Sequence, residues 1–379
     1  MVAVTKLRAA GAVMLAVALT CPPAYALVSF NDGTDHVFFT GTASMAYDSN
    51  IFAHAGGAGD YIYSAGLLFE YTRQAGMIGV AASVAVNASR FGSNTMENFN
   101  NPHLAAEFTK TAGRTTGALT VSAARVSEAD VLANVRTDSW NYDAGLHFKY
   151  PVIERYSFSG TLAYTDKVYD GSANLTDLQT FTAGTDLLYA LRSDRDLTAG
   201  YQFRQSETSS SAAYADHSFT VGVSGKILSK LTGSLRAGYQ VRQPLGSTPD
   251  GGYKGLTASG SVTWTLTKKW SLVGQLSKDL SVTANDLSVD TLSTSLALQY
   301  TMNDRLSFST NAGVGKTRFL GDAGDGRHDE YFTWGAGLKY KMNAHLDSSL
   351  AYVYNQNWST FSYSDFTRHS VVLALSSRW

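Results

Sequence analysis

The run FTWGAGLKYKM, residues 332–342, decides the fold class because two kinds of side chain alternate along it. Its even-numbered positions carry Phe, Trp, Ala, Leu, Tyr and Met, and its odd-numbered positions carry Thr, Gly and Lys. Successive side chains of a β-strand point to opposite faces, so a period of two predicts a strand with one apolar and one polar face. The same alternation recurs in residues 231–242 and 270–277 and dominates the chain from residue 36 onward.

The connections between the alternating runs fall into two classes. Short connections occur at 74–76, 112–114, 151–155, 193–195, 228–230, 267–269, 302–304 and 342–344. Longer connections rich in Gly, Ser and Asp occur at 51–59, 92–101, 127–136, 170–177, 208–215, 245–252, 284–286, 320–329 and 357–365. The two classes interleave, which predicts about 18 strands (16–18) with both chain ends on the side of the short turns. No connection clearly exceeds the others, so the pattern does not indicate a single long loop folded inward as a constriction.

The first residues have the features of a secretory signal. Lys6 and Arg8 precede an apolar run, and the small-x-small sequence Ala24-Tyr25-Ala26 follows. We therefore predict a signal peptide at residues 1–26 and a single domain at residues 27–379. A lipoprotein signal at Cys21 is the alternative, but the residues on either side of this cysteine suit that processing poorly. Cys21 is the only cysteine, so the mature chain has neither disulfides nor thiol-based metal sites.

Composition narrows the class of protein. Charged residues make up 16% of the chain, against about 25% in ordinary soluble domains, whereas aromatic residues make up 12%. Loss of Lys6 and Arg8 takes the formal net charge from −1 to −3, and no basic cluster occurs, which argues against a nucleic-acid partner. After residue 26 no apolar run approaches the roughly 18 residues of a membrane helix.

These features together predict an all-β, transmembrane, antiparallel outer-membrane β-barrel of a Gram-negative bacterium. Short periplasmic turns at one rim and longer extracellular loops at the other are typical of such barrels, whereas a soluble sandwich usually has similar connections at both ends. Outer-membrane lipid is then a partner of the apolar face. Aromatic residues at strand ends fit girdles at the two interfaces: Tyr150, Tyr156, Trp264, Trp270, Tyr300, Tyr340, Trp358 and Tyr363.

The chain ends in RHSVVLALSSRW, residues 368–379, with an apolar residue at alternate positions before a terminal aromatic. Outer-membrane barrels typically end in this way, and the barrel-insertion machinery reads the signal. The predicted insertion signal consists of Val371, Leu373, Leu375 and Trp379. Ser377 departs from the pattern, since an apolar or aromatic residue is usual there.

If the apolar face meets lipid, the polar face lines the interior. A charge on the lipid face near the midplane costs about 2–4 kcal/mol, so the phase of the charged residues assigns them inward. The predicted lumen-lining residues are Asp48, Asn50, Glu70, Asp143, Lys149, Arg192, Arg204, Lys226, Arg236, Arg242, Lys339 and Lys341. Two interpretations stay open: the basic residues pair with acids of the wall, or they form a ladder that guides anions or anionic glycans.

Sequences that resemble chemical motifs do not predict catalysis. Gly313 to Thr317 reads GVGKT, but a phosphate-binding loop also needs Gly at Thr310 and a helix afterwards. Residues 321–330 read GDAGDGRHDE, whose carboxylates suit either a Ca²⁺ loop or a solvated loop, and their spacing is not that of an EF-hand. The histidines are scattered and no catalytic triad stands out. We therefore predict no enzyme activity, no cofactor and no metal.

The run AYDSNIF, residues 46–52, resembles the start of the putative beta-barrel porin 2 family. Proteins of that family commonly begin with a strand that ends in Tyr-Asp-x-Asn-aliphatic-aromatic, and Tyr47, Asp48, Asn50, Ile51 and Phe52 match it. The resemblance implies a barrel that exports a secreted polysaccharide, with periplasmic polysaccharide-export proteins and the exported glycan as partners.

Three functions follow from these observations. The first is a hydrated conduit for export of an exopolysaccharide, without catalysis. The alternative is a general or solute-selective diffusion porin that works as a trimer. The third is a closed barrel whose loops serve adhesion or anchoring.

Overall fold

The chain forms one closed β-sheet. The computed structural model describes residues 26–171, 175–210, 212–246, 252–321, 324 and 326–379. Of the predicted signal peptide, all but Ala26 lies outside the described residues. The helical elements among the described residues are single turns, and none has the length and hydrophobicity needed to cross a bilayer.

Nineteen strands account for most of the described chain. They are β1 Val28–Phe30, β2 Asp35–Asp48, β3 Asp60–Arg73, β4 Gly79–Phe91, β5 Phe99–Lys110, β6 Thr116–Asp130, β7 Val135–Ile153, β8 Tyr156–Tyr169, β9 Leu178–Arg192 and β10 Arg195–Thr208. They continue as β11 Ala213–Leu228, β12 Leu231–Leu245, β13 Tyr253–Thr265, β14 Trp270–Val282, β15 Ser288–Thr301, β16 Leu306–Phe319, β17 His328–Lys341, β18 Leu346–Ser359 and β19 Phe366–Arg378. Two short 3-10 helices, η1 Thr95–Glu97 and η3 Ser362–Ser364, lie between strands.

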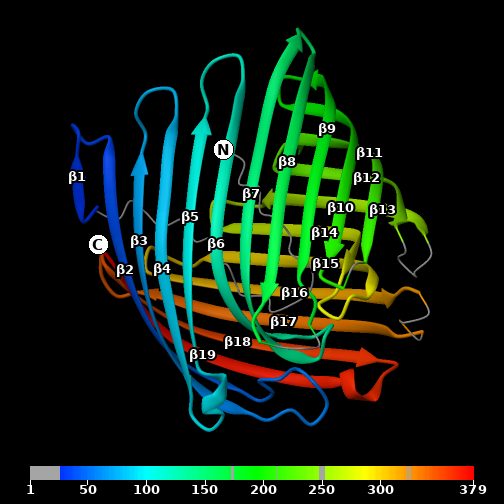
Figure 1. Ribbon diagram of the computed structural model, residues 1–379. Helices are drawn as coiled ribbons and strands as arrows, with labels where there is room; N and C mark the ends of the chain where they lie inside the picture. Colours follow the sequence, from blue (N-terminus) through cyan, green and yellow to red (C-terminus); the bar gives the residue numbers. More distant parts are fainter. Residues whose placement is uncertain (1–25, 172–174, 211, 247–251, 322–323, 325) are drawn as a thin grey trace.

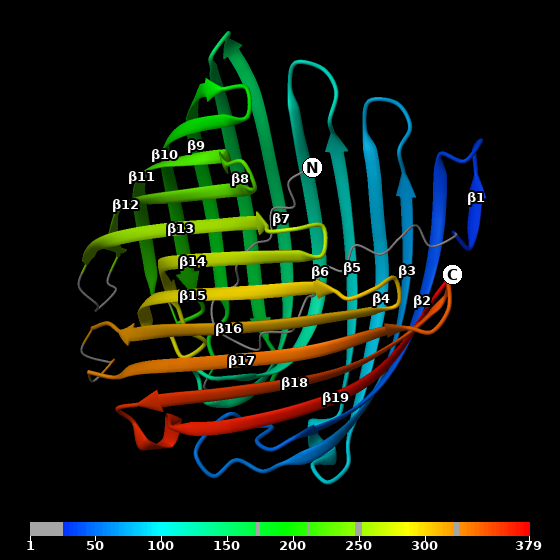
Figure 2. The same ribbon diagram turned by 180° about the vertical axis from the view of Figure 1, so that it is seen from behind.

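Eighteen strands close the barrel, which confirms the predicted fold and strand number. Each strand from β2 to β19 pairs antiparallel with the next, and β19 pairs with β2 from Ser370–Asp48 to Arg378–Thr40. In Figure 1 the strands of the near wall, β2–β8, run up the page while β13–β19 run across behind them, and Figure 2 shows the same crossing from behind. Closure of a barrel requires strands tilted by about 35–45°, so opposite walls cross in projection.

β1 lies in line with β19. Arg378, the last residue of β19, pairs with Thr40 of β2. The residues of β2 that precede Thr40 therefore have no partner in β19. β1 takes that edge, with Phe30 opposite Asp35 and Val28 opposite Val37. Between β1 and β19 along this edge, the backbone of Phe39 in β2 exchanges hydrogen bonds with the backbone of Trp379. Both described chain ends therefore meet at the rim of the short connections.

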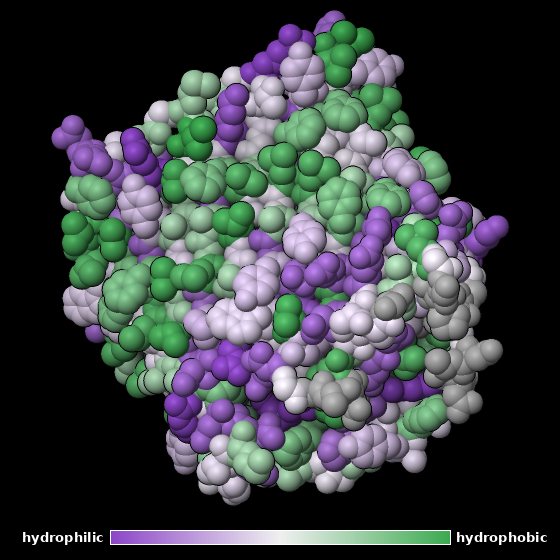
Figure 3. Space-filling view, viewed as in Figure 1, coloured by the Kyte–Doolittle hydropathy of each residue, from purple (hydrophilic) through white to green (hydrophobic). Residues whose placement is uncertain are grey.

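The apolar phase of the strands faces outward. Met45, Tyr63, Leu256 and Leu373 are among the large apolar side chains that stay exposed, as a lipid-facing wall requires. Figure 3 shows hydrophobic side chains over much of the near wall, with hydrophilic ones gathered toward its lower part, where the longer connections lie. Aromatic rings stack at the opposite rim, where the centroids of Trp270 and Tyr300 are 4.0 Å apart.

The two rims differ as predicted. Connections at one rim have two to five residues, and those at the other have four to eleven. The prediction of a loop at 127–136 is wrong in part, because β6 continues to Asp130 and β7 begins at Val135. The β6–β7 ladder therefore extends to the pair of Asp130 with Val135, which leaves a turn of four residues. Hydrogen bonds between the two strands satisfy the backbone groups of the hairpin.

The tip of the β6–β7 hairpin, residues 125–138, folds into the barrel. β6 pairs with β5 only up to Ala124, and β7 pairs with β8 only from Ser139 onward. On β6, Leu119 is exposed on the outer wall, whereas Ala129, in the same phase, is only 4% exposed. The tip has therefore left the wall, and in Figure 1 it sweeps across the lower opening.

The end of the β14–β15 hairpin also turns inward. β13 pairs with β14 only from Ala258–Lys278 down to the short connection. On β15, Leu292 is exposed while Asp290, in the same phase, is 8% exposed. Beyond Lys278 the hairpin passes inside the end of β13, where the Tyr253 hydroxyl donates a hydrogen bond to Asp290 over 2.9 Å. We call this junction of β13 with β14 and β15 the seam.

The opening of the barrel at the longer rim is therefore obstructed although no single connection is much longer than the others. The inward elements are continuations of paired strands, so loop length gives no sign of them. The β6–β7 tip detaches from β5 and β8, and the β14–β15 end detaches from β13. Each carries its own hydrogen-bonded ladder into the interior. The mouth at the longer rim is narrowed from two sides.

Candidate functional site: the barrel interior

The β6–β7 tip is held inside the barrel by polar contacts with four connections of the longer rim. The Arg136 guanidinium lies 2.8 Å from a carboxylate oxygen of Glu97 and donates a hydrogen bond of 3.1 Å to the carbonyl of Ile51. Ser364 donates its hydroxyl proton to the Asn134 side chain over 2.6 Å. Arg327 donates to the carbonyl of Leu132 over 3.1 Å. Arg136, Asn134 and Leu132 thus join the tip to the connections after β2, β4, β16 and β18.

A small apolar cluster lies under the same tip. Ala129 of β6 packs with Ala53 of the β2–β3 connection and Phe366 of β19, and Val131 packs against them. Each of the three central side chains is buried. Apolar burial thus adds to the polar contacts, because the tip removes this surface from water.

The Tyr-Asp-x-Asn run builds the seat for this hairpin. Two guanidinium nitrogens of Arg368 bind the Asp48 carboxylate at 2.5–3.0 Å, and the same carboxylate accepts the backbone N–H of Asn50. Asn50 donates to the carbonyl of His54 over 2.8 Å. A Cβ at Gly57 would lie 1.9 Å from the Asn50 side-chain oxygen, so that position needs glycine. The run therefore shapes the connection whose Ile51 carbonyl receives the hairpin.

Beneath the seam, Asp216 of β11 binds two arginines. Its carboxylate accepts hydrogen bonds from Arg204 at 2.8 and 3.0 Å and from Arg242 at 2.7 and 2.8 Å. Arg204 also reaches Asp279 at 2.7 Å, and Arg242 donates to Ser288 over 3.1 Å. Since Asp279 and Ser288 belong to the inward hairpin, this network joins it to the wall formed by β10–β12. Asp216 and Arg242 are nearly fully buried, and their charges are paired as buried charges must be.

A second ion pair crosses the interior face of four strands. Arg236 of β12 lies 2.5 Å from Asp186 of β9, with β10 and β11 between them. The two intervening strands carry Gly200 and Gly222 on that face. A Cβ at Gly200 would lie 2.1 Å from the Asp186 oxygen, and a Cβ at Gly222 would lie 2.8 Å from Cγ of Arg236. Glycines therefore clear the path along which the two side chains meet.

The remaining predicted lumen residues lie on the inward phase and have varied partners. Glu70 pairs with Arg378 at 3.1 Å, Lys149 with Asp196 at 3.2 Å, Lys226 with Asp194 at 3.8 Å and Lys339 with Asp347 at 2.8 Å. Asp143 accepts hydrogen bonds from Ser122 and Thr165, while Lys341 sits opposite Asp347 in the β17–β18 ladder. Arg192 is exposed beside the short β9–β10 connection. Most of the basic residues thus face acids of the wall rather than forming an unpaired ladder.

Burial divides the predicted residues into two groups. Asp48, Asn50 and Arg242 are at most 4% exposed, because the loops and inward hairpins cover them. Glu70, Lys149 and Lys226 keep about a third or more of their side chains exposed. A role in contacting a passing solute stays a prediction for the second group.

One side of the interior has almost no charge. By register, the inward phase of β13–β16 carries Ser259, Ser261, Thr263, Ser271, Gln275, Ser277, Thr291, Ser293, Ser295, Gln299, Ser307, Ser309, Asn311 and Thr317. In these four strands, all of whose residues are described, Asp279 is the one charged side chain of that phase. Hydroxyl and amide groups both donate and accept hydrogen bonds, so this wall suits uncharged polar solutes.

Several residues of the site were missed from sequence. Asp216, Arg368 and Asp196 stand in the inward phase of their strands, so alternation was a usable signal for them. Arg136 and Asp290 stand in the outward phase. Polar residues in the apolar phase near a hairpin end were the signal that the hairpins leave the lipid.

The motifs that resemble chemical sites bring no reactive groups together. Gly313 to Thr317 lies within β16 rather than before a helix. Asp322 and Asp325 of the possible Ca²⁺ loop lie outside the described residues. Among the described residues, no group of three His, Cys, Asp or Glu side chains is arranged to hold a metal ion.

The predicted insertion signal lies on the outer wall. Val371, Leu373, Leu375 and Trp379 are all exposed in the outward phase of β19 or directly after it. The indole N–H of Trp379 donates to the Ser377 hydroxyl over 2.9 Å. Recognition by the insertion machinery stays a prediction.

Comparison with known proteins supports the barrel. The sequence model of the family described as Putative beta-barrel porin 2 matches residues 216–378, which confirms the resemblance. The match does not include Tyr47 to Phe52, the residues from which the resemblance was inferred. No curated protein matches the chain.

Similar solved structures include OpdK, OccK2 and a BenF-like porin. OpdK of Pseudomonas aeruginosa with vanillate is 14% identical with a TM-score of 0.50, covering 90% of this chain and 99% of its own. OccK2 (OpdF) of the same organism with glucuronate is 13% identical with a TM-score of 0.52, covering 93% and 99%. A BenF-like porin of Pseudomonas fluorescens Pf-5 is 13% identical with a TM-score of 0.51, covering 90% and 99%. At such identities the likeness shows the fold, and the closed barrel places the chain in the bacterial outer membrane.

Proposed function

We propose that this chain, an outer-membrane barrel related to the putative beta-barrel porin 2 family, is a diffusion porin for small hydrophilic solutes. The observation that carries the proposal is the pair of inward hairpins. The β6–β7 tip and the β14–β15 end enter the interior from walls eight strands apart in a barrel of eighteen. An 18-stranded barrel is otherwise wide enough for an aqueous channel. Such hairpins select by size at the longer rim.

The inner walls supply the second half of the argument. Paired charges on β7–β12 and uncharged hydroxyl and amide groups on β13–β16 give a hydrated surface without a strong field of one sign. A solute can exchange hydrogen bonds along it while most of the charges that it passes are paired. The described residues of the two walls bring no constellation of reactive groups together, and passage without catalysis is the proposed activity.

Conductance tests the proposal directly. The purified barrel is reconstituted in planar bilayers and compared with a variant in which residues 128–137 are replaced by Asn-Gly, a favoured two-residue hairpin turn. We expect discrete ion-conducting steps for the natural chain and larger steps for the variant, because the obstruction is removed. A matched control replaces residues 111–115 of a short connection with Asn-Gly and leaves the step size unchanged. Failure of both the natural chain and the hairpin variant to conduct would exclude a channel and favour the closed-barrel function.

Export of an exopolysaccharide is the second candidate, because the hydroxyl and amide wall of β13–β16 suits a sliding glycan. Periplasmic polysaccharide-export proteins would then meet the rim of short connections. Deletion of the gene separates the two candidates: loss of surface polysaccharide supports the conduit. Unchanged polysaccharide with reduced uptake of small solutes supports the porin.

A further inference from the structure

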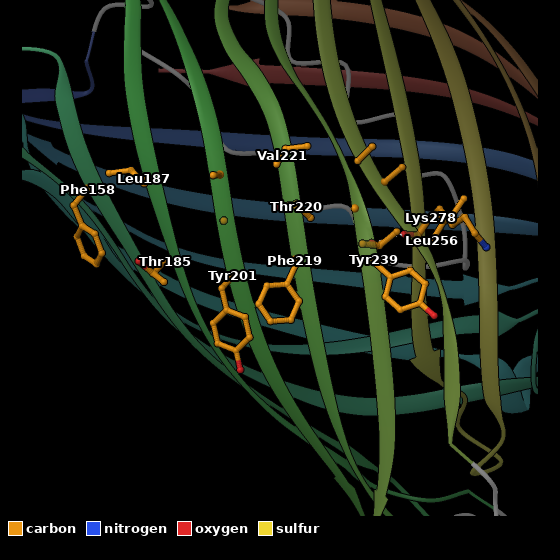
Figure 4. A pocket seen from close by; sticks show the side chains of 16 residues that line it. Phe158, Thr185, Leu187, Tyr201, Phe219, Thr220, Val221, Tyr239, Leu256 and Lys278 are labelled. Atoms are coloured by element: carbon orange, nitrogen blue, oxygen red, sulfur yellow. Dashed lines mark hydrogen bonds between the residues drawn. The ribbon is translucent and has the colours of Figure 1, made fainter.

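The seam interrupts the backbone ladder between β13 and β14. The two strands pair from Ala258–Lys278 down to the short connection, and residues 253–257 of β13 do not pair with β14. Residues 279–282 of β14 pair with β15 on one side and have left β13 on the other. Figure 4 shows the side chains of Leu256 and Lys278 close together where the strands part. An interrupted ladder leaves backbone groups that need other hydrogen-bond partners.

Side chains replace the missing ladder on the edge of β14. The Thr257 hydroxyl donates to the carbonyl of Lys278 over 2.9 Å, so that carbonyl points toward β13. Residues two apart on an antiparallel strand direct their backbone groups to the same side, so those of Leu280 point toward β13 too. The Leu280 carbonyl accepts a hydrogen bond of 2.6 Å from Arg204, and its N–H donates to the Asp279 carboxylate over 2.8 Å. Arg204 and Asp279 thus occupy the groups through which a longer β13–β14 ladder would form.

The end of β14 keeps the side-chain pattern of a strand in the wall. If the existing register continued past Lys278, Leu280 would stand opposite Leu256, and Ser281 opposite Gly255. Leu280 is 2% exposed inside the barrel and would then lie on the outer wall beside Leu256, which is 70% exposed. Ser281 would face the interior. Because the register itself does not shift, every side chain would keep its proper face.

Continuing the ladder would break some contacts of the hairpin and keep others. The carbonyl of Ala284 accepts a hydrogen bond of 2.8 Å from a backbone N–H of the β8–β9 connection, and Ser210 of the β10–β11 connection donates to Asp286. Both bonds require the inward position. Asp290 and Arg318 stand opposite each other in the β15–β16 ladder, so their ion pair does not depend on β13. The two positions therefore exchange side-chain and loop contacts for backbone hydrogen bonds.

We propose that the end of the β14–β15 hairpin is a gate with two positions. In the inward position it narrows the mouth of the barrel. In the second position residues 279–283 pair with residues 253–257 and become part of the wall. Arg204 holds the inward position, because it binds Asp279 and the carbonyl of Leu280. Control of flow by this gate rests on the proposed porin function, whereas the existence of the second position does not.

A disulfide can capture the second position. Because the backbone groups of Leu280 point toward β13, the neighbouring pair of Gly255 with Ser281 is of the non-hydrogen-bonded kind. Its Cα atoms would lie about 4.5 Å apart, within reach of a disulfide. In the inward position Ser281 points away from β13, because the opposite phase of the hairpin, which carries Asp290, faces Tyr253. We expect Gly255→Cys with Ser281→Cys to join when the purified barrel is oxidised, seen as a mobility shift that a reductant reverses.

Two cysteine pairs serve as references for this disulfide. Ser261→Cys with Gln275→Cys lies in the existing ladder and should join under the same conditions. Gly255→Cys with Ser271→Cys, at the other end of β14, should not join. The temperature at which each variant loses its compact mobility on gels shows that it is folded.

The rate of disulfide formation tests the role of Arg204. Arg204→Ala removes the donor to the Leu280 carbonyl and should raise the rate for Gly255→Cys with Ser281→Cys by about tenfold or more, since hydrogen bonds to a charged group are lost. Arg236→Ala is the matched control, because Arg236 binds Asp186 of β9, and it should leave the rate unchanged. Equal rates for the two arginine variants would overturn the assigned role.

Conductance of the double cysteine variant, Gly255→Cys with Ser281→Cys, separates the gate from the porin function. Under the porin proposal the oxidised form should conduct in larger steps than the reduced form, because the hairpin end is held in the wall. If the disulfide forms but neither form conducts, the porin function fails and the second position stands. Conducting steps that oxidation leaves unchanged would overturn the gate. Absence of the disulfide even with Arg204→Ala, under conditions that join Ser261→Cys with Gln275→Cys, would overturn the second position.

Discussion

At the scale of single residues, the carboxylate of Asp216 holds two guanidinium groups in the interior. Asp216→Ala leaves the buried Arg242 without its charge partner, and removal of one member of a buried pair costs about 3–5 kcal/mol. We expect the free energy of unfolding in detergent to fall by that amount. Urea titration followed by the change in gel mobility measures it.

The matched control removes an acid from an exposed pair. Lys226 and Asp194 lie 3.8 Å apart with nearly half of each side chain exposed, so Asp194→Ala should change stability by less than about 1 kcal/mol. Equal losses for Asp194→Ala and Asp216→Ala would contradict the buried network.

The pair of Arg236 with Asp186 makes a prediction for selectivity. Asp186→Asn keeps the size of the side chain and releases the charge of Arg236 into the interior. Under the proposed porin function, the channel should then favour anions more strongly, seen as a shift of the reversal potential under a salt gradient. Asp166→Asn, in the outward phase of β8, serves as the control, and an equal shift for both variants would count against a conducting path past Arg236.

Alternation along the sequence predicts the phase of these residues but not their partners. Arg236 and Asp186 are 50 residues apart in sequence, and Gly200 and Gly222 between them give the path that joins them. The sequence pattern carries no information on which inward residue lies opposite which. That depends on the stagger of four strands.

At the scale of elements, Arg136 is the main polar link of the β6–β7 tip. Arg136→Ala removes its contacts with Glu97 and the Ile51 carbonyl. Under the porin proposal, the tip should then spend time away from its seat, giving noisier current and a larger mean conductance in planar bilayers. Arg90→Ala is the control, because Arg90 bonds within β4 and β5 on the outward phase. A quiet, unchanged current for Arg136→Ala would show that the apolar cluster and the contacts of Asn134 and Leu132 hold the tip without Arg136.

Strands and turns of the wall are predictable from alternation, and the inward hairpins are not. Residues 127–136 read as a polar loop because Ser127, Asn134 and Arg136 interrupt the apolar phase. Polar residues interrupt that phase equally in a solvated loop and in a hairpin that enters water inside a barrel. Only the contacts at the far end, such as that of Asn134 with Ser364, distinguish the two.

At the scale of the whole molecule, the lack of cysteine in residues 26–379 allows a direct test of the inward position. Asn134→Cys with Ser364→Cys places two thiols where side-chain oxygens now lie 2.6 Å apart. Oxidation should join them within one chain, producing a mobility shift that a reductant reverses. Asn134→Cys with Lys268→Cys at the other rim should not join. Cross-linking only between molecules would contradict the inward fold.

The overall architecture follows from a few sequence features. Asymmetric connections and a period of two predict about 18 strands. These strands must close into a barrel, because only closure satisfies the backbone hydrogen-bonding groups in lipid. The Tyr-Asp-x-Asn run suggests the family although the family match lies in residues 216–378. In the structure, Asp48 and Asn50 of this run shape the connection that binds the β6–β7 hairpin, a role that no local pattern reveals.

The short strand β1 has a consequence for how the barrel reaches its final diameter. The closing strands β19 and β2 could slide past each other in steps of two residues with every side chain still on its proper face. Such a slip would change the shear of the barrel and with it the bore. β1 occupies the edge of β2 from Asp35 to Val37 and blocks the slide in one direction. The three-residue strand β1, which is not one of the eighteen strands of the barrel, thus limits the diameter of the folded barrel.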